Sequence, residues 1–220
     1  TNPFHASVLH NVNLNTEGSA KETRHIEIDL GDSGLNYEPG DALGVYPLNN
    51  SAYVDELLSA LKMTGEESII VAKETLSLRK AFIENLDITA LSRINMQKYA
   101  DATNSDDLQT LLDDEHKEDF KEYIWGRQIL DLVEDYPADG LTAQDFVNVL
   151  RRIPGRLYSI ASSITAHPGQ VHLLVGAVRY HSFDRDREGV CSTFLSGRMQ
   201  QDEELAIYVQ PNKHFHLPED

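Results

Sequence analysis

Two β-type regions separated by a long region of helical periodicity constrain the fold of this chain more than any other feature. Near the start, residues 24–30 alternate, with Ile26, Ile28 and Leu30 on one face and charged side chains on the other. Near the end, residues 171–178 form an apolar run that predicts a strand buried on both faces, and residues 205–209 predict another strand. Alternation with one polar face is typical of an antiparallel sheet or barrel wall, so we expect one β-domain interrupted by a helical insertion.

The middle region contains four apolar stripes at helical spacing. Asn50 or Ser51 is suited to cap the first helix, and Thr142 with Asp145 resembles a capping box for the last. The charged tract from Asp113 to Lys121 is expected to be a solvated helix face. The stripes are Val54, Leu57, Leu58 and Leu61; Leu78, Phe82, Ile83 and Leu86; Trp125, Ile129, Leu130, Leu132 and Val133; and Phe146, Val149 and Leu150. A helical stretch is also expected over residues 192–200. We therefore expect β-domain segments at 1–47 and 154–220 and a helical insertion at 48–153.

Charge and composition exclude several classes of protein. The 220 residues include 36 acidic and 19 basic side chains, a formal net charge of −17, which disfavours binding to nucleic acid or to anionic lipid. No apolar stretch approaches the ~18 residues of a membrane span, and we expect no signal peptide. The single cysteine cannot form an internal disulfide. We expect a cytoplasmic protein with no membrane or nucleic-acid partner.

Several familiar motifs are missing from the sequence. There is no phosphate-binding Gly-Lys-Ser/Thr loop, no Gly-x-Gly-x-x-Gly and no Gly-x-Ser-x-Gly, so a nicotinamide site of the usual type is not expected. The alternate histidines His214 and His216 have no carboxylate–histidine cluster nearby. No metal site is expected.

The first segment that could carry chemistry is residues 156–163, which follow a Pro-Gly pair and resemble a polar edge strand. Along a strand, Arg156, Tyr158 and Ile160 share one face. An arginine fork binds phosphate through two nitrogens, and a tyrosine ring offers a flat stacking surface. The combination suits a nucleotide with an extended aromatic ring, although an ordinary edge strand with surface Arg and Tyr explains it equally well.

The second segment is residues 189–193, directly before the apolar helical stretch from Phe194 to Met199. A glycine followed by free backbone N–H groups at a helix N-terminus is suited to bind a diphosphate. Simple N-capping by Ser192 or Thr193 is the alternative. Cys191 is expected to be a small packed residue and not a nucleophile, because no basic partner is fixed near it.

Short segments along almost the whole chain occur in the order typical of one known family. The most specific is Arg156-Leu157-Tyr158-Ser159 with a downstream Gly189-Val190-Cys191-Ser192. The other segments are 2–4, 24–30, 37–47, 87–89, 135–137 and 215–218. Together they resemble the flavin domain of the diflavin reductases. Within that family, residues 29–45 are most similar to the bacterial sulfite reductase flavoproteins.

The resemblance implies a mainly β fold, a six-stranded antiparallel FAD-binding barrel of the ferredoxin-reductase type, with an α-helical connecting domain as the insertion. It implies an FAD-binding module of an NADPH-dependent reductase, with the FMN-binding and NADPH-binding domains outside this chain. Electrons would pass from NADPH to FAD, to FMN, and then to the siroheme hemoprotein subunit of sulfite reductase. By itself the chain is not expected to turn over NADPH.

The resemblance also implies a role for each matching residue. Arg156 is expected to hold the FAD diphosphate, Tyr158 to stack on the isoalloxazine ring, and Ser159 to lie at the flavin N5 as the catalytic position. Gly189, Val190, Cys191 and Ser192 are expected to surround the diphosphate with backbone N–H groups. The remaining cofactor contacts are expected from Leu157, Thr89, Leu174, Val175, Gly176 and Tyr180.

Two other functions remain open from the sequence. One is the reductase of a bacterial cytochrome monooxygenase, with the same FAD site and another electron acceptor. The other is a non-redox interaction module, in which Arg156, Tyr158 and Ser159 are surface residues. His216 stands where the family usually has arginine, so no role is assigned to it.

Overall fold

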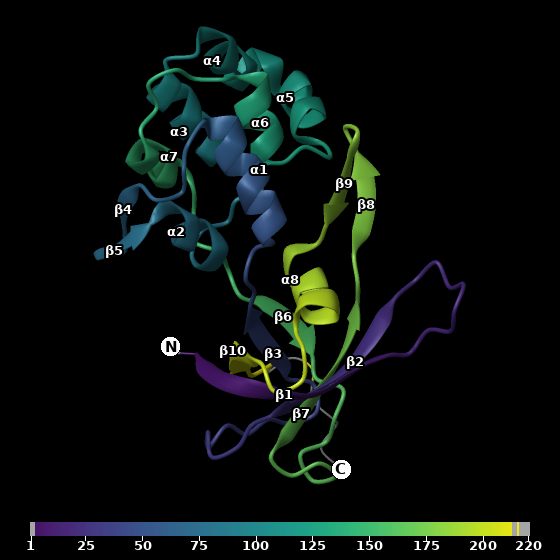
Figure 1. The fold of residues 1–220 in the computed structure, drawn as a ribbon. Coiled ribbons are helices and arrows are strands. Elements are labelled where there is room, and N and C mark those ends of the chain that lie inside the picture. The colour runs from purple at the N-terminus through teal and green to yellow at the C-terminus, as the bar shows by residue number, and fades with distance from the viewer. Residues whose placement is uncertain (1–2, 213–214, 216–220) are drawn as a thin grey trace. The chain divides into compact units, whose positions relative to one another are not determined.

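The computed structural model describes residues 3–212 and 215, which fall into two compact units (Figure 1). The sheet unit comprises the chain up to Leu48, Pro154–Tyr180, and the chain from Asp186 onward. The helical unit comprises Asn49–Ile153 and His181–Arg185. Within the described ranges, no helix has the length and apolar character needed to cross a bilayer.

Six strands form the main sheet in the described part of the sheet unit, in the order β6-β3-β10-β1-β2-β7. All of its pairings are antiparallel, as expected from the alternating pattern. The strands are β1 (Phe4–Asn13), β2 (Thr23–Asp29), β3 (Ala42–Tyr46), β6 (Arg156–Ser159), β7 (Gln170–Gly176) and β10 (Glu204–Gln210).

The pairing of β2 with β7 supplies much of the core of this unit. Ile26 lies opposite Leu173 and Ile28 opposite Val171, and all four side chains are buried. The predicted inward face of residues 24–30 is therefore confirmed. The other face of β7 is only partly covered, because Leu174 keeps 53% of its surface exposed. The prediction of a strand buried on both faces was wrong at that position.

Strand β6 is an edge strand in the sheet order, as predicted, and pairs with β3. Directly after β6, Ile160 forms a β-bridge with Leu173 of β7. The Ala161 N–H donates to the His172 carbonyl at 2.9 Å. The chain that leaves β6 is thus hydrogen-bonded to β7, which is the opposite end of the sheet order.

Four further elements of the chain lie between β7 and β10 in sequence. Strands β8 (Arg179–Ser182) and β9 (Arg185–Glu188) pair as a two-stranded ribbon. A short helix, α8 (Val190–Thr193), continues into a π-helical segment, η2 (Phe194–Arg198). Phe194 and Leu195 are buried in the core of the sheet unit, so the predicted helical stretch is confirmed with an earlier start.

The helical unit is built from short helices and one hairpin (Figure 1). Its elements are α1 (Ser51–Leu61), β4 (Ser68–Val71), β5 (Glu74–Ser77), α2 (Leu78–Glu84), α3 (Arg93–Thr103), α4 (Asp106–Leu112), the 3₁₀ turn η1 (Asp114–His116), α5 (Lys117–Ile124), α6 (Ile129–Asp135) and α7 (Ala143–Val149). Strands β4 and β5 pair only with each other in the described part of the chain.

The predicted caps and stripes correspond to α1, α2, α6 and α7, whereas α3, α4 and the β4–β5 hairpin were not predicted. Asn50 accepts a hydrogen bond from the Ala52 N–H at the start of α1, and Thr142 accepts one from the Asp145 N–H at the start of α7. The α5 helix in the charged tract has no buried residue, as expected. Trp125 was placed wrongly, because it lies after α5, outside any helix, and its surface is 83% exposed. The third apolar stripe begins instead at Ile129.

Candidate FAD-binding site

Arg156, Tyr158 and Cys191 come together from two distant parts of the sequence. Arg156 and Tyr158 lie on β6, paired with Val45 and Leu43 of β3. Cys191 lies in α8 and is 3% exposed. Burial raises the pKa of the Cys191 thiol to about 11, although the hydrogen bond with the Tyr158 hydroxyl and the charge of Arg156 oppose the shift. The thiol is therefore neutral and packed, as the sequence predicted.

The Tyr158 side chain is half-buried against the core of the sheet unit. Burial, followed by the neighbouring Cys191 sulfur, raises the pKa of Tyr158 well above its usual value. The ring is consequently uncharged at any physiological pH. Its hydroxyl is held at the start of α8, which fixes the ring on the face of β6 that Arg156 shares.

Arg156 has an exposed side chain and forms no ion pair with any residue that the structure describes. Several other arginines of the chain do have acidic partners. Arg179 contacts Glu22, and Arg185 contacts Glu134 at 2.6 Å. Arg156 is thus free to bind an anion beside α8.

The start of α8 supplies backbone donors next to Arg156. Gly189 is the N-cap, so the N–H groups of the next three residues have no partner within the helix. The Ser192 hydroxyl accepts from the Val178 N–H at 3.1 Å and donates to the Gly189 carbonyl at 3.2 Å. These two hydrogen bonds hold the Gly189 turn in place. A Cβ at Gly189 would lie 2.7 Å from the Ser192 Oγ, so a larger residue would displace this loop.

This arrangement of donors fits the FAD diphosphate. The family model described as an FAD-binding domain matches residues 1–194. The chain belongs to this FAD-binding domain family. FAD is therefore its cofactor, as predicted, and the flavin-module resemblance found in the sequence is confirmed.

This FAD-binding domain is similar to longer curated proteins. It is 48% identical over its whole length to the sulfite reductase [NADPH] flavoprotein alpha-component of Bacillus subtilis (strain 168), of which it spans 37%. It is 41% identical, again over its whole length, to the corresponding protein of Shewanella sp. (strain MR-4), of which it spans 36%. The chain thus spans just over a third of the length of these relatives.

Arg198 is a residue of the FAD-binding domain that the sequence reasoning missed. Its guanidinium donates to the Leu48 carbonyl at 2.9 Å and to the Val190 carbonyl at 3.0 Å. Burial lowers the pKa of Arg198, and its charge lowers the pKa of Cys191. Among the described residues it has no acidic partner within 4 Å, so a second positive charge lies at α8. Its position at the end of η2 belongs to no recognised motif.

Apart from Thr89, the other residues predicted to contact the cofactor lie on β6, β7 and β8. Ser159 and Leu157 alternate with Arg156 and Tyr158 along β6, so their side chains lie on the opposite face and are exposed. Tyr180 on β8 is 43% exposed. Among the proposed backbone-lining residues of β7, Val175 is a core residue, whereas Leu174 and Gly176 are exposed.

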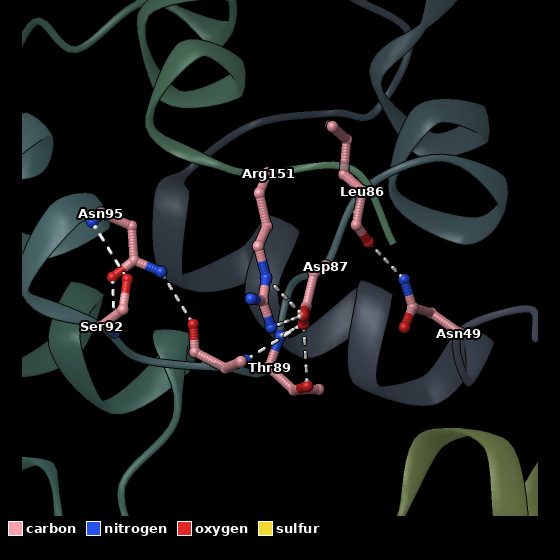
Figure 2. A network of polar contacts seen from close by, with 8 residues as sticks. Asn49, Leu86, Asp87, Thr89, Ser92, Asn95 and Arg151 are labelled. Atoms are coloured by element: carbon pink, nitrogen blue, oxygen red, sulfur yellow. Dashed lines mark hydrogen bonds and ion pairs between the residues drawn. The ribbon is translucent and has the colours of Figure 1, made fainter. Parts of the chain in front are cut away.

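Thr89 belongs to the helical unit, where Figure 2 shows it in a polar network around Asp87. The Thr89 hydroxyl and N–H donate to Asp87 Oδ1 at 3.1 and 3.3 Å, and Arg151 binds the other oxygen of that carboxylate. The Thr89 hydroxyl keeps its acceptor lone pairs free for a ligand. His216, left without a role, lies outside the described residues.

Proposed function

We propose that this chain is the FAD-binding module of an NADPH-dependent diflavin reductase of the sulfite reductase type. The observation that carries the proposal is Arg156, a cation without an acidic partner in the described chain, beside the stacking ring of Tyr158 and the free N–H groups of α8. Identity of 38–48% to sulfite reductase flavoprotein alpha-components over the whole chain supports this choice. The reductase of a cytochrome monooxygenase and a non-redox interaction module were the alternatives left open by the sequence.

The chain's own residues bind and orient the cofactor. Arg156 holds the diphosphate, together with the N–H groups of Val190, Cys191 and Ser192, and Tyr158 offers its ring to the isoalloxazine. The resemblance assigns Ser159 to the flavin N5 and Tyr180 to the adenosine, although the Ser159 side chain lies on the other face of β6 from Tyr158. The bound FAD supplies the redox chemistry, taking a hydride and releasing electrons one at a time. Further contacts come from Gly189, Leu157, Leu174, Val175, Gly176 and Thr89.

We also propose that the six-stranded sheet closes into a barrel. The β-bridge between Ile160 and Leu173 supports this closure, because it joins the chain after β6 to β7 at the other end of the sheet order. Closure would leave the barrel without an open edge. In this architecture residues 1–47 and 154–220 form the FAD-binding barrel, and residues 48–153 form the connecting domain.

The complete protein would add the parts that this module needs for turnover. An NADPH-binding domain would deliver the hydride, an FMN-binding domain would receive the electrons, and the siroheme hemoprotein subunit of sulfite reductase would be the final acceptor in the cytoplasm. The module alone would not turn over NADPH, because its sequence has no nicotinamide-binding motif.

The Arg156→Ala variant tests the proposed diphosphate contact. Loss of a charge-assisted contact of about 1.5–3 kcal/mol would lower FAD affinity roughly 10- to 150-fold. The FAD dissociation constants of the unmodified chain and of the Arg156→Ala variant are measured by flavin fluorescence. Arg152→Ala removes an exposed cation four positions earlier and serves as the matched control. Equal FAD affinity in Arg156→Ala and Arg152→Ala would contradict the assignment.

A further inference from the structure

A cluster of histidines lies on the outer face of the sheet unit, formed by residues that are not assigned to FAD. Glu27 of β2 lies directly opposite His172 of β7, and His25 lies two residues before Glu27 on the same face. The intervening Ile26 is buried in the core, so the side chains of His25 and Glu27 point to the other side of the sheet. The strand pairing thus brings two imidazoles and one carboxylate together.

The distances within this cluster suit a transition metal. The His25 Nε2 and His172 Nδ1 atoms are 3.3 Å apart. Two nitrogens bound to a tetrahedral Zn²⁺ at 2.0–2.1 Å lie about 3.3 Å from each other. One ligand atom from each of His25, Glu27 and His172 lies within 4.8 Å of the others. The two nitrogens already have the required separation; to bind a metal through Nε2, His25 must carry its proton on Nδ1, and the carboxylate must move closer.

The surroundings of His172 hold its imidazole in the orientation that a metal needs. The Nε2 atom lies 3.2 Å from Gln170 Oε1, and an amide oxygen can only accept, so Nε2 carries the proton and Nδ1 presents its lone pair to His25. Metal-bound histidines characteristically donate their second N–H to such an acceptor. The His172 N–H also donates to the Ser162 hydroxyl at 2.9 Å, which fixes the backbone.

The cluster is open to solvent through Glu27. The Glu27 carboxylate is 24% exposed and its side chain contacts His25 and His10, so it is reached from solvent.

We propose that His25, Glu27 and His172 form a binding site for one divalent transition-metal ion, with Zn²⁺ as the best match. Water fills the fourth position, or His167 does, since its ring centroid lies 4.3 Å from that of His172. The ion would crosslink β2 and β7 and so stabilise the sheet unit. The site is independent of the proposed FAD function, because none of its ligands is assigned to the cofactor.

Sequence reasoning did not find this site. Its ligands come from two strands separated by 147 positions, counted from His25 to His172, and no spacing motif joins them. The histidines considered from sequence were His214 and His216, which lie outside the described residues. Only the register of β2 against β7 reveals the ligand set.

Isothermal titration of the tag-free, chelator-treated chain with zinc chloride tests the proposal. We expect one Zn²⁺ per chain and a melting temperature that rises with zinc concentration. Gln170→Ala, which removes only the orienting acceptor, should weaken binding about 10- to 100-fold, and His25→Ala should weaken it at least as much. His25 is used as the ligand variant because its side chain is 30% exposed, so its loss does not open the core.

His116→Ala is the matched control, because His116 pairs with a single carboxylate, Asp119, and has no second histidine beside it. The control should bind zinc like the unmodified chain. Absence of saturable binding in the unmodified chain would overturn the proposal, and the 3.3 Å contact would then be a hydrogen bond between two histidines. Equal weakening in His25→Ala and His116→Ala would also overturn it, since it would indicate adventitious binding to surface histidines.

Discussion

Arg151 binds the Asp87 carboxylate through two nitrogen atoms, Nη2 at 2.8 Å and Nε at 3.1 Å (Figure 2). The Asp87 N–H donates in return to the Arg151 carbonyl at 2.9 Å. The other carboxylate oxygen accepts from Thr89 and from the Ala90 N–H. One buried side chain thus joins the last residues of the helical insertion to the segment that contains Thr89.

Arg151→Ala should destabilise the helical unit. In this variant the Asp87 carboxylate loses its charged partner. Because the Asp87 side chain is only 3% exposed, water cannot replace that partner. Hydrogen bonds to charged groups contribute about 1.5–3 kcal/mol, and we expect a loss of that size in the free energy of unfolding. Urea unfolding followed by circular dichroism measures it, with Arg152→Ala as the control. A loss no larger than that of the control would contradict the structural role of this pair.

The same carboxylate should make the chain sensitive to acid. Burial alone would raise the pKa of Asp87, but the hydrogen bonds from Arg151, Ala90 and Thr89 together hold it below its usual value of 3.8. A depressed pKa in the folded state means that the stabilisation is present above pH 3.8 and is lost as the pH falls through the lower folded value. Protonation in acid therefore removes this contribution.

Asp87→Asn tests that dependence. The variant should be less stable than the unmodified chain at pH 7 and should lose less stability between pH 5 and pH 3. Unfolding free energies at several pH values measure the difference. Asp139→Asn, which alters a carboxyl that is 97% exposed, is the control. If Asp87→Asn lost as much stability in acid as the control, Asp87 would not be a source of the dependence.

Replacing Tyr158 separates its ring from its hydroxyl. Tyr158→Phe keeps the stacking surface and removes only the contact with Cys191, so FAD should stay bound with its fluorescence quenched. Tyr158→Ala removes a stacking interaction of about 1 kcal/mol beyond the buried area, so FAD affinity should fall roughly fivefold or more and the fluorescence should rise. Flavin fluorescence titration measures both effects. Identical curves for the two variants would place the ring away from the flavin.

The Cys191 thiol should react slowly in the folded chain. With its pKa raised to about 11 by burial, only about one thiol in a thousand is a thiolate at pH 8. Alkylation by iodoacetamide should therefore be far slower in the native chain than in the same chain in urea. Mass spectrometry of the modified cysteine follows the reaction. A native rate equal to the rate in urea would mean that Cys191 is not packed as described.

Regular periodicity made the main elements predictable. The alternation around Ile26 and Ile28 gave β2 its inward face, and the cap residues Asn50 and Thr142 gave the starts of two helices. The two segments Arg156–Ser159 and Gly189–Ser192 could be predicted to form one site, because their residue types and their order are specific to one family. The closeness of Arg156, Tyr158 and Cys191 then follows from the fold.

Other features left no local signal in the sequence. The turn between β4 and β5 places Ala72 and Lys73 at positive φ, with no glycine or asparagine to indicate a hairpin. Trp125 fitted a helical stripe by spacing, but α5 ends before it and its side chain stays in solvent. Arg198 acquires its role only through carbonyl groups of distant residues, which no side-chain pattern encodes.

FAD binding by the purified chain tests the central claim most directly. The absorbance spectrum is recorded first, the protein is then heated, and the released flavin is identified; a colourless preparation is titrated with FAD. We predict one FAD per chain, with a flavin spectrum in the native protein and FAD in the supernatant. A protein that carries no flavin and takes up no added FAD would contradict the account of Arg156, Tyr158 and α8 as a cofactor site.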